Sequence, residues 1–464
     1  MLMTLAAIAR AVGARPAGLA DPDRLVRGAG MDSRAVAPGS LFACIRGERA
    51  DGHDFAAAAV RAGAAVVLAE RELPELAGKA PVLVVESAAA ALGRLASAWR
   101  EKAGARVVAV TGTAGKTSVK EMILAILGLR FAVAGTKGNY NNQLGLPLSM
   151  LACPETAKIW VLELGVSRPG DMEELGRIAR PDLAVIVNIG PAHLDGLVDL
   201  AGVARAKAAL AGLIAPGGKV LASRDYPELW DAVTRLHPNA VAFSAADPSA
   251  RFFAAYLGAN CTGSRFRVRL NGDEGQLKLP FCGEHAAENL AAASGAALLM
   301  GVKAGDVEAG LAALTIPGGR FRPICAGELT FIDDTYNANP LSMARSIAAA
   351  AERAAGGPLV LVLGEMRELG AEAAARHREL GAAIAGSDCL AVYFHGEHSG
   401  ELAAGLAEAG YRGAFAPVGS PAEFAGLFAG LGLTRGVVLF KGSRSLGMEK
   451  FLAAVAEMAT RERA

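Results

Sequence analysis

The stretch that most constrains the fold of this chain spans residues 106–118 and reads RVVAVTGTAGKTS. It begins with a short apolar run rich in valine, which is typical of a strand buried in a parallel sheet. A turn rich in glycine comes next, and Lys116, Thr117 and a helical pattern follow it without a break. A strand, a glycine loop, a lysine beside a hydroxyl residue and a helix, in this order, predict a phosphate-binding loop within an α/β fold.

The chemistry of this loop follows from its residue types. Glycines allow the backbone to approach a polyphosphate and to point N–H groups at it, and the helix N-terminus adds further donors. The Lys116 ammonium can reach the β- and γ-phosphates, and the Thr117 hydroxyl can bind Mg²⁺. The residues expected to hold the phosphates are Gly112, Thr113, Ala114, Gly115, Lys116, Thr117 and Ser118.

The match is to a shorter form of the general pattern, TGTxGKTS, because Val110 stands where the general pattern has a glycine. An ordinary glycine-rich turn between a strand and a helix is the alternative interpretation. The lysine, the threonine and the flanking strand and helix together speak against it.

Polar residues follow two further apolar runs of strand type, at residues 159–165 and 183–190. Glu163 lies near the carboxyl end of the first run, and His193 lies shortly after the second. Carboxyl ends of parallel strands meet at the ligand crevice of such a sheet, so both side chains could reach the phosphate loop. We interpret Glu163 as a Mg²⁺ ligand, with a solvated strand end as the alternative. His193 stays evenly open between a functional and a structural role.

Two other polar features are candidate ligand contacts. Residues 138–143 form a loop rich in hydrogen-bond donors that includes Asn141 and Asn142, although turn formation alone would also explain its asparagines. Asn289 stands inside an alanine-rich helical pattern, where its low helix propensity indicates a hydrogen-bonding task.

A polar cluster near the N-terminus mixes hydrogen-bond donors with cations. It contains Ser33, Arg34, Arg46 and His53, together with Asp32. The cluster could bind an anionic polar ligand. From the residues alone, capping and turn formation is the slightly favoured interpretation.

Composition narrows the class of protein. The chain carries 47 basic and 46 acidic side chains, and this balance argues against nucleic acid and against a membrane surface as partners. The six cysteines are scattered without metal-like spacing, so we expect reduced, mostly buried thiols in a cytoplasmic protein. The apolar N-terminus lacks a preceding basic region and predicts an amphipathic helix, not a signal peptide. No apolar run reaches membrane-spanning length, so no membrane insertion is expected.

Strand-like and helix-like segments alternate along the chain, which predicts an α/β fold. We expect three domains. A small N-terminal α/β domain spans residues 1–104, and a central, P-loop ATPase-like domain with a mostly parallel sheet spans 105–319. A Rossmann-like α/β domain spans 320–464, and the glycine pair before Arg320 is the expected hinge.

Several motifs complete the pattern begun by the phosphate loop. They are Glu163-Leu164-Gly165, Asn188 followed by His193-Leu194, Ala206-Lys207, Gly283-Glu284-His285 followed by Asn289, and Gly319-Arg320. In this order they resemble the Mur ligases, the ATP-dependent amino-acid ligases of peptidoglycan synthesis. The resemblance covers all three expected domains. One departure is Ala208-Ala209, where members of the family commonly carry Gly-Glu.

Residues 138–142 and 333–340 look most like the family member that acts on UDP-N-acetylmuramoyl-tripeptide and D-alanyl-D-alanine. The resemblance implies that ATP phosphorylates the terminal carboxylate of the tripeptide. The amine of D-alanyl-D-alanine would then attack the acyl phosphate and release phosphate. A cytoplasmic monomer whose substrates are these small molecules is the corresponding expectation.

The resemblance also implies roles for individual residues. The catalytic set is Lys116, Glu163, His193 and Lys207. Thr117 and Glu163 would bind one Mg²⁺, and His193 with a carbamylated Lys207 would bind a second; without the family, Lys207 would be a solvated helix residue. The implied nucleotide contacts are Asn289, Arg320, Asp334, Tyr336 and Asn337. The implied substrate contacts are Ser33, Arg34, Arg46, His53, Asn141, Asn142, Asn339, Lys441, Ser443 and Arg444.

Three alternatives compete with this function. Folylpolyglutamate synthase tends to carry Gly-Lys-Gly-Ser in the loop, whereas this chain has Gly-Lys-Thr-Ser. The Mur ligase that adds the third residue would carry an Asp-Asn-Pro-Arg type motif in its last domain, and this sequence has none. A nucleotide-binding regulator without catalysis would not need the complete set of Lys116, Glu163, His193 and Lys207.

Overall fold

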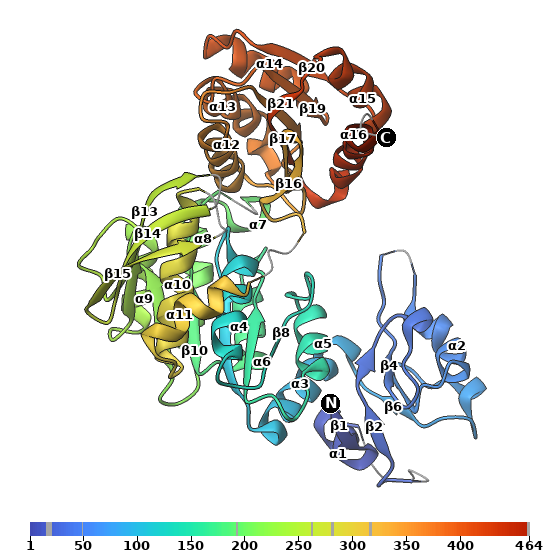
Figure 1. Ribbon diagram of the computed structural model, residues 1–464. Coiled ribbons are helices and arrows are strands. Elements are labelled where there is room, and N and C mark those ends of the chain that lie inside the picture. The colour runs from blue at the N-terminus through green and yellow to red at the C-terminus, as the bar shows by residue number, and fades with distance from the viewer. Residues whose placement is uncertain are drawn as a thin grey trace.

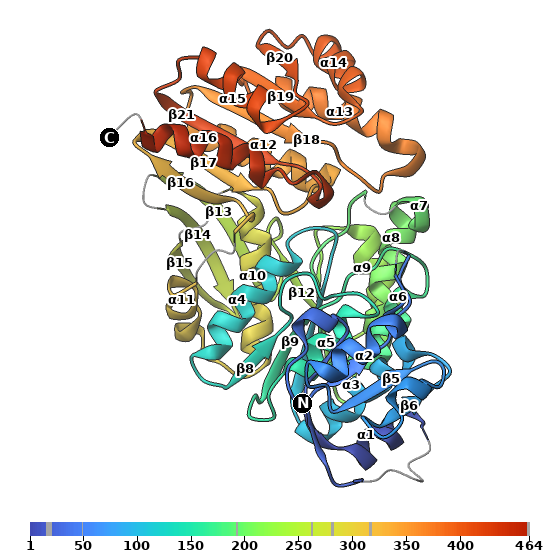
Figure 2. The same cartoon turned by 90° about the vertical axis from the view of Figure 1, so that its right-hand side faces the viewer.

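The computed structural model describes residues 1–14, 21–48, 50–191, 194–260, 263–279, 283–314 and 318–461. These residues form three successive α/β regions, each with its own parallel or mostly parallel sheet (Figure 1). The C-terminal region packs against one end of the central region, and the N-terminal region lies at the other end (Figure 2). The predicted fold class, three α/β domains with mostly parallel sheets, is confirmed.

The N-terminal region combines a small parallel sheet with an antiparallel strand pair. Its elements are β1 (Leu2–Thr4), α1 (Leu5–Val12), β2 (Leu25–Arg27), β3 (Ala29–Gly30), η1 (Ser33–Ala35), β4 (Leu41–Ala43), η2 (Gly52–Phe55), α2 (Ala56–Arg61), β5 (Val66–Ala69), η3 (Pro74–Leu76), β6 (Val82–Val84) and α3 (Ala88–Ala103), where η denotes a 3₁₀ helix. The sheet order is β3-β4-β5-β6, and β1 pairs with β2. The expected amphipathic helix is α1, which begins after the Thr4 cap and buries Leu5, Ile8 and Val12.

The central region is built on the largest sheet. Its elements are β7 (Arg106–Thr111), α4 (Lys116–Gly128), β8 (Val133–Gly135), α5 (Gly145–Ala152), β9 (Ile159–Glu163), α6 (Asp171–Ala179), β10 (Leu183–Ile186), α7 (Leu194–Leu197), α8 (Leu200–Ala208), η4 (Ala209–Gly212), β11 (Lys219–Ser223), α9 (Pro227–Leu236), β12 (Val241–Ser244), β13 (Phe252–Asn260), β14 (Gly263–Leu270), β15 (Asp273–Leu279), α10 (His285–Leu299) and α11 (Ala304–Ala312). The sheet order is β15-β14-β13-β12-β11-β10-β7-β9-β8, parallel from β8 to β13 and antiparallel in its last two pairings.

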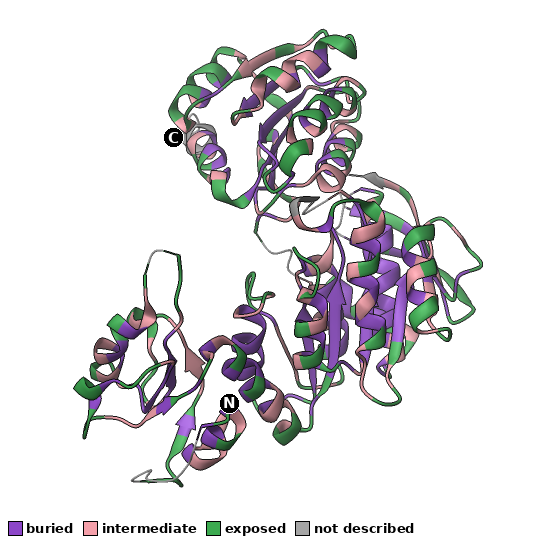
Figure 3. Ribbon diagram, turned by 180° about the vertical axis from the view of Figure 1, so that it is seen from behind, coloured by how far each residue is buried: buried purple, intermediate pink, exposed green. Residues whose placement is uncertain are grey.

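Strand β7 lies inside this sheet, and both of its faces are covered. Val107 and Ala109 belong to a hydrophobic core shared with α1 and α3, whereas Val108 and Val110 belong to the core under α4 and α10. This alternation is the two-residue period of a strand, and covering both faces explains why the run is apolar throughout. Buried residues accordingly follow the strands of the central sheet (Figure 3).

The C-terminal region contains a second α/β sheet. Its elements are β16 (Arg322–Ala326), β17 (Glu328–Asp334), α12 (Pro340–Ala354), β18 (Leu359–Gly364), η5 (Gly370–Glu372), α13 (Ala373–Ala385), β19 (Ala391–His395), α14 (Ser399–Glu408), β20 (Ala414–Pro417), α15 (Pro421–Gly430), β21 (Arg435–Lys441), η6 (Arg444–Leu446) and α16 (Glu449–Arg461). The order is β16-β17-β21-β18-β19-β20, with β16 antiparallel and the other neighbours parallel. The carboxyl ends of β17, β21 and β18 therefore lie side by side.

Two expectations from composition can be checked on the described residues. Cys44, Cys153 and Cys389 are buried free thiols and Cys325 is an exposed one, as expected for mostly buried reduced cysteines. No helix in the ranges given above combines the length and the apolar character that a membrane crossing requires.

Candidate active site

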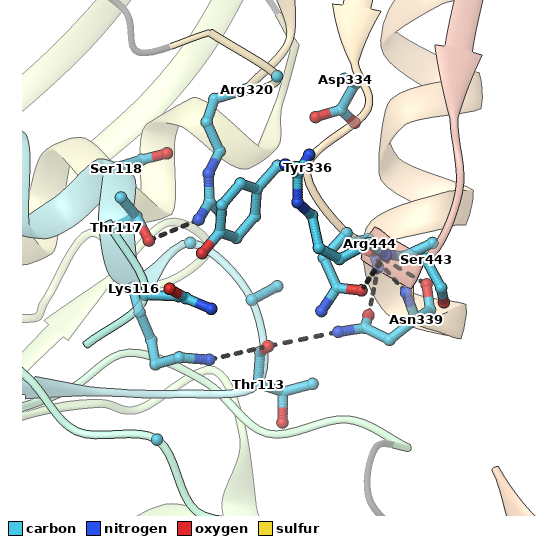
Figure 4. A pocket seen from close by; sticks show the side chains of 18 of the residues that line it. Thr113, Lys116, Thr117, Ser118, Arg320, Asp334, Tyr336, Asn339, Ser443 and Arg444 are labelled. Carbon is cyan, nitrogen blue, oxygen red and sulfur yellow. Dashed lines mark hydrogen bonds between the residues drawn. The ribbon is translucent and has the colours of Figure 1, made fainter. Parts of the chain in front are cut away.

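A cavity of about 610 Å³ lies between the phosphate loop and the C-terminal region. Most of the predicted site residues line it (Figure 4). From the central region these are Thr113, Ala114, Gly115, Lys116, Thr117, Ser118, Asn141, Asn142, Glu163 and Asn289; from the segment after residue 319 they are Arg320, Asp334, Tyr336, Asn337, Asn339, Lys441, Ser443 and Arg444. Residues far apart in sequence thus meet at the carboxyl ends of two sheets.

The phosphate loop joins β7 to α4 through Gly115, whose φ is +78°. A Cβ atom at this position would lie 2.3 Å from Asn289 Oδ1, so the backbone and the packing both require glycine. Lys116 Nζ donates to the main-chain oxygen of Gly112 at 2.8 Å. Burial lowers the pKa of Lys116 below its ordinary value, against the opposing effect of Glu163. The loop therefore places a desolvated cation at the cavity wall.

Thr117 and Glu163 are joined directly at the base of the cavity. Thr117 Oγ1 donates to Glu163 Oε2 at 2.7 Å, and Asn141 Nδ2 donates to Glu163 Oε1 at 2.8 Å. Glu163 is only 3% exposed. A hydroxyl and a buried carboxylate side by side are oxygen ligands of the kind that Mg²⁺ prefers, so these residues fit the predicted metal.

The second predicted metal site is only partly described. His193 lies outside the described residues. Lys207 is 2% exposed near the end of α8, and burial followed by repulsion from Lys116 lowers its pKa well below the ordinary value. Among the residues that the structure describes, no cluster of three or more histidine, cysteine or acidic side chains could hold a metal ion. The second Mg²⁺ and the carbamate stay predictions.

Arg320 and Tyr336 form the wall opposite the loop. The Arg320 guanidinium lies 3.7 Å from the centre of the Tyr336 ring, and its Nη2 donates to Thr117 Oγ1 at 2.7 Å (Figure 4). The segment that leads into the C-terminal sheet thus contacts the threonine of the phosphate loop. A planar cation stacked on an aromatic ring presents a flat surface to a ligand in the cavity.

Asp334 anchors the end of β17. Its Oδ2 accepts from Lys441 Nζ at 2.7 Å and from Ser346 Oγ at 2.5 Å, while its Oδ1 accepts from the Phe321 amide at 3.1 Å. The Lys441 ammonium also donates to the main-chain oxygen of Asn337 at 3.1 Å. These bonds hold the carboxyl ends of β17 and β21 together at the cavity.

Asn339 connects α12 to the phosphate loop. Its Oδ1 caps the helix by accepting from the Ser342 amide at 2.9 Å, and its Nδ2 donates to the Thr113 main-chain oxygen at 3.3 Å. Pro340 at the first position of the helix completes a typical start.

Two buried polar atoms at the cavity have no hydrogen-bond partner among the described residues. They are His285 Nδ1 and Asn289 Oδ1, and both residues line the cavity. Burial and then the charge of Arg345 lower the pKa of His285 to about 4, so its ring is neutral at pH 7. Buried polar groups are nearly always paired in proteins, so unpaired ones on residues that line a cavity indicate a place for a polar ligand.

The predicted contacts of the N-terminal region do not line this cavity. His53 is 1% exposed; its Nδ1 lies 2.5 Å from Asp51 Oδ1, and its Nε2 accepts from the Glu70 amide. Arg34 pairs with Asp32 through two side-chain hydrogen bonds. The predicted substrate contacts Ser33, Arg34, Arg46 and His53 stay predictions, and the geometry of His53 favours the turn-forming alternative.

Several residues that line the cavity, or that bond to its lining, received no role from the sequence. His285 and Asn188 were present in the motifs without a function, while Glu288, Arg345 and Arg367 were not singled out. Asn188 directly follows the apolar run that contains β10, and this position at a strand end could have marked it as a candidate residue of the crevice. Glu288 and Arg345 lie in alanine-rich helices, where a charged residue by itself carries little information about its partner.

Comparison with known proteins places the chain in a family. The Mur ligase middle domain matches residues 110–297, the glutamate ligase domain of Mur ligases matches 319–444, and the catalytic domain of the Mur ligase family matches 25–100. A UDP-N-acetylmuramoyl-tripeptide–D-alanyl-D-alanine ligase from Bacillus subtilis (strain 168) is 35% identical over 382 residues, which are 82% of each chain.

Solved structures agree with this assignment. The crystal structure of MurF from Acinetobacter baumannii superposes with a TM-score of 0.87 at 30% identity, covering 98% of this chain and 99% of that one. The MurF ligase from Thermotoga maritima in complex with ADP gives a TM-score of 0.82 at 29% identity, covering 95% and 99%. The chain belongs to the Mur ligase family.

Proposed function

We propose that this chain is an ATP-dependent ligase that joins D-alanyl-D-alanine to UDP-N-acetylmuramoyl-tripeptide, a step of peptidoglycan synthesis. The observation that carries the proposal is the cavity itself, in which a phosphate loop and a Thr117–Glu163 pair face the carboxyl ends of the C-terminal sheet. A relative 35% identical over 82% of the chain bears the name of this activity, and a structural neighbour was solved with ADP. The proposed enzyme is a cytoplasmic monomer.

The chemistry has two stages. A carboxylate is a poor electrophile, so an oxygen of the tripeptide's terminal carboxylate attacks the γ-phosphorus of ATP, giving an acyl phosphate and ADP. The amine of D-alanyl-D-alanine then attacks the acyl carbon, and phosphate leaves with the original carboxylate oxygen. The loop amides and Lys116 hold the polyphosphate and stabilise the charge that develops on the transferred phosphoryl group.

Thr117 and Glu163 would hold the Mg²⁺ that neutralises phosphate charge when it is bound. His285 and Asn289 offer their unpaired polar atoms to the nucleotide, and the Arg320–Tyr336 stack offers it a flat surface. Asp334 and Asn337 belong to the same wall. These contacts lie on both sides of the cavity, so ATP would bridge the central and C-terminal regions.

Lys207 and His193 would contribute the second metal site. Because burial disfavours the Lys207 ammonium, a larger fraction of Lys207 is the neutral amine than at an exposed lysine. A neutral amine can react with carbon dioxide to give a carbamate, which is an anionic oxygen ligand. Carbamylation of Lys207 is thus part of the proposal.

The three regions would divide the substrates between them. We assign the UDP-muramoyl substrate to residues 1–104 with Asn141 and Asn142, and ATP to 105–319. The incoming dipeptide belongs to 320–464, where Lys441, Ser443 and Arg444 line the cavity near Asn339.

Phosphate release from ATP tests the proposal. The assay contains Mg²⁺ and UDP-N-acetylmuramoyl-tripeptide, with D-alanyl-D-alanine added or withheld. We expect sustained release only with both substrates, and a UDP-muramoyl-pentapeptide in the mass spectrum. Release that needs glutamate and a folate would indicate folylpolyglutamate synthase. Release that needs a UDP-muramoyl-dipeptide and the third amino acid would indicate the Mur ligase that adds the third residue. Binding of ATP without any turnover would favour a regulator.

A further inference from the structure

We propose that Asn188, Glu288 and Arg345 form a positioning relay that links the docking of the C-terminal region to the geometry of the phosphate loop. The relay runs from the loop amides through Asn188 and Glu288, in the central region, to Arg345 on α12. The inference rests on the proposed binding of ATP at the loop. It does not depend on which amine or carboxylate the ligase uses.

The first link connects Asn188 to the loop. Asn188 is fully buried after β10, and its Oδ1 accepts from the amides of Thr113 and Ala114 at 3.0 and 2.9 Å. Its main-chain oxygen also accepts from the Thr113 amide at 3.1 Å. The amide side chain of Asn188 therefore holds the first half of the loop against β10. The amides from Gly115 onward, at the start of α4, stay available for phosphate.

The second link fixes the orientation of Asn188. Its Nδ2 donates to Glu288 Oε2 at 2.8 Å. An ionised carboxylate only accepts hydrogen bonds, so it requires the NH₂ side of the amide to face Glu288 and the oxygen to face the loop. If the amide turned over, the NH₂ group would point at the loop N–H groups, where two donors cannot pair. By fixing the orientation of the Asn188 side chain, Glu288 keeps Asn188 Oδ1 in place as the acceptor for the loop amides.

The third link supplies the cation that Glu288 needs. Arg345 Nη1 donates to Glu288 Oε2 at 2.9 Å, and its Nη2 donates to the Tyr226 hydroxyl at 2.7 Å. The Glu288 side chain is 4% exposed, and a buried carboxylate without a partner is strongly disfavoured. Arg345 comes from the C-terminal region, whereas Glu288 and Tyr226 belong to the central one. Docking of α12 therefore supplies the charged partner of this buried carboxylate.

The three links have one consequence. When Arg345 is removed or withdrawn, Glu288 Oε2 loses the donor that Arg345 supplies, and the buried carboxylate loses a contact that fixes its position beside Asn188. The orientation of Asn188 is then no longer determined, and the loop amides lose a fixed acceptor. Nucleotide affinity should accordingly depend on a residue of the C-terminal region that acts through Glu288.

A double-mutant cycle tests the relay with Mg²⁺–ADP as the probe, measured by isothermal titration calorimetry. We expect E288Q and R345M each to weaken ADP binding by about tenfold, the size of a lost charged hydrogen bond. The double variant should be within about twofold of the weaker single variant, because both changes break the same relay. R345K should recover most of the affinity, since lysine can still donate to Glu288. N188A should weaken binding to a similar degree.

The matched control is Y256F. Tyr256 on β13 donates to Glu352 on α12 at 2.5 Å, so it also joins the central region to α12, but no hydrogen bond or ion pair of the described structure joins Glu352 to the loop. ADP affinity should stay unchanged in this variant. Thermal unfolding of each variant confirms that the protein is folded, and the near-isosteric E288Q keeps the test valid if N188A does not fold.

Three outcomes would overturn the relay. Tight ADP binding by the wild type with unchanged affinity in E288Q and R345M would reject it while leaving the proposed function intact. Fully additive losses in the double variant would show that Arg345 touches the nucleotide directly. Absence of ADP binding by the wild type would overturn the proposed ATP site and the relay with it.

Discussion

The cavity beside the phosphate loop and the polar cluster of the N-terminal region contain the same kinds of side chain, but these side chains differ in whether their polar atoms have hydrogen-bond partners. In the N-terminal cluster both ring nitrogens of His53 are occupied, by Asp51 and by the Glu70 amide. In the cavity, His285 Nδ1 and Asn289 Oδ1 have no partner in the described part of the chain. Groups that are paired locally build the fold, and buried groups left unpaired beside a cavity indicate a ligand.

The largest effect expected from this difference concerns Lys116. K116M should reduce ATP-dependent phosphate release by about 10³-fold, because the cation that stabilises the transferred phosphoryl group is lost. Stability should change little, because the hydrogen bond lost at the Gly112 main-chain oxygen is offset by the removal of a cation that burial disfavours. The phosphate-release assay and thermal unfolding measure the two quantities.

Lys120 provides the matched control for Lys116. It lies one turn further along α4, is 1% exposed, and donates to the Thr136 main-chain oxygen. K120M should lower the free energy of unfolding by about 1–3 kcal/mol, because a buried acceptor loses its donor. Activity per folded molecule should stay near that of the wild type. Equal loss of activity in both variants would show that a general change in α4, not the loop cation, is responsible.

The pKa of His285 should make the free energy of unfolding depend on pH. Its pKa is about 4 in the folded protein, whereas an exposed histidine has a pKa near 6.5. Between these values the unfolded chain binds the extra proton, so stability is lost as the pH falls from about 6.5 to 4, by about 3 kcal/mol from this residue. H285Q should lose correspondingly less stability over this range in urea unfolding. An identical pH dependence in both proteins would refute the buried neutral ring.

Gly115 tests the contact between the loop and Asn289. G115A places a methyl carbon 2.3 Å from Asn289 Oδ1 and strains a backbone with φ of +78°, so we expect roughly 100-fold lower activity from the displaced loop. Gly104 has a similar φ of +62° but open space around it, which makes G104A the control for backbone strain alone. If G104A lost as much activity as G115A, the Asn289 contact would not be the cause.

The smallest effect is expected at His53. H53A should lower the free energy of unfolding by about 2 kcal/mol, because the buried Glu70 amide loses its acceptor. The KM for the UDP-muramoyl substrate should change less than twofold. A rise above tenfold without loss of stability would contradict the comparison and support the substrate contact that the sequence suggested.

The parts that sequence reasoning predicted well depend on neighbours along the chain. The phosphate loop could be predicted because its strand, its glycines, Lys116 and the following helix are contiguous. Glu163 could be connected to the loop because parallel strands bring their carboxyl ends to one crevice. The structure places Glu163 Oε2 2.7 Å from Thr117 Oγ1, so the two side chains do meet; that they share a metal ion stays a prediction.

The contacts that sequence reasoning missed join residues that are far apart in the sequence. Asn188 and Glu288 are 100 residues apart, and Glu288 and Arg345 are 57 apart. A single charge in an alanine-rich helix does not reveal which residue it meets, because helix packing sets that contact. His53 shows the opposite case, since its local partners Asp51 and Glu70 explain its burial without any ligand. Pairing across regions therefore required the structure.

The central claim is that ATP activates a carboxylate at this cavity, and oxygen transfer tests it most directly. The terminal carboxylate of UDP-N-acetylmuramoyl-tripeptide is labelled with ¹⁸O and turned over with ATP, Mg²⁺ and D-alanyl-D-alanine. An acyl phosphate predicts that one labelled oxygen appears in each phosphate released, and that K116M releases labelled phosphate about 10³-fold more slowly. Phosphate that carries only solvent or ATP oxygen while pentapeptide forms would contradict the mechanism.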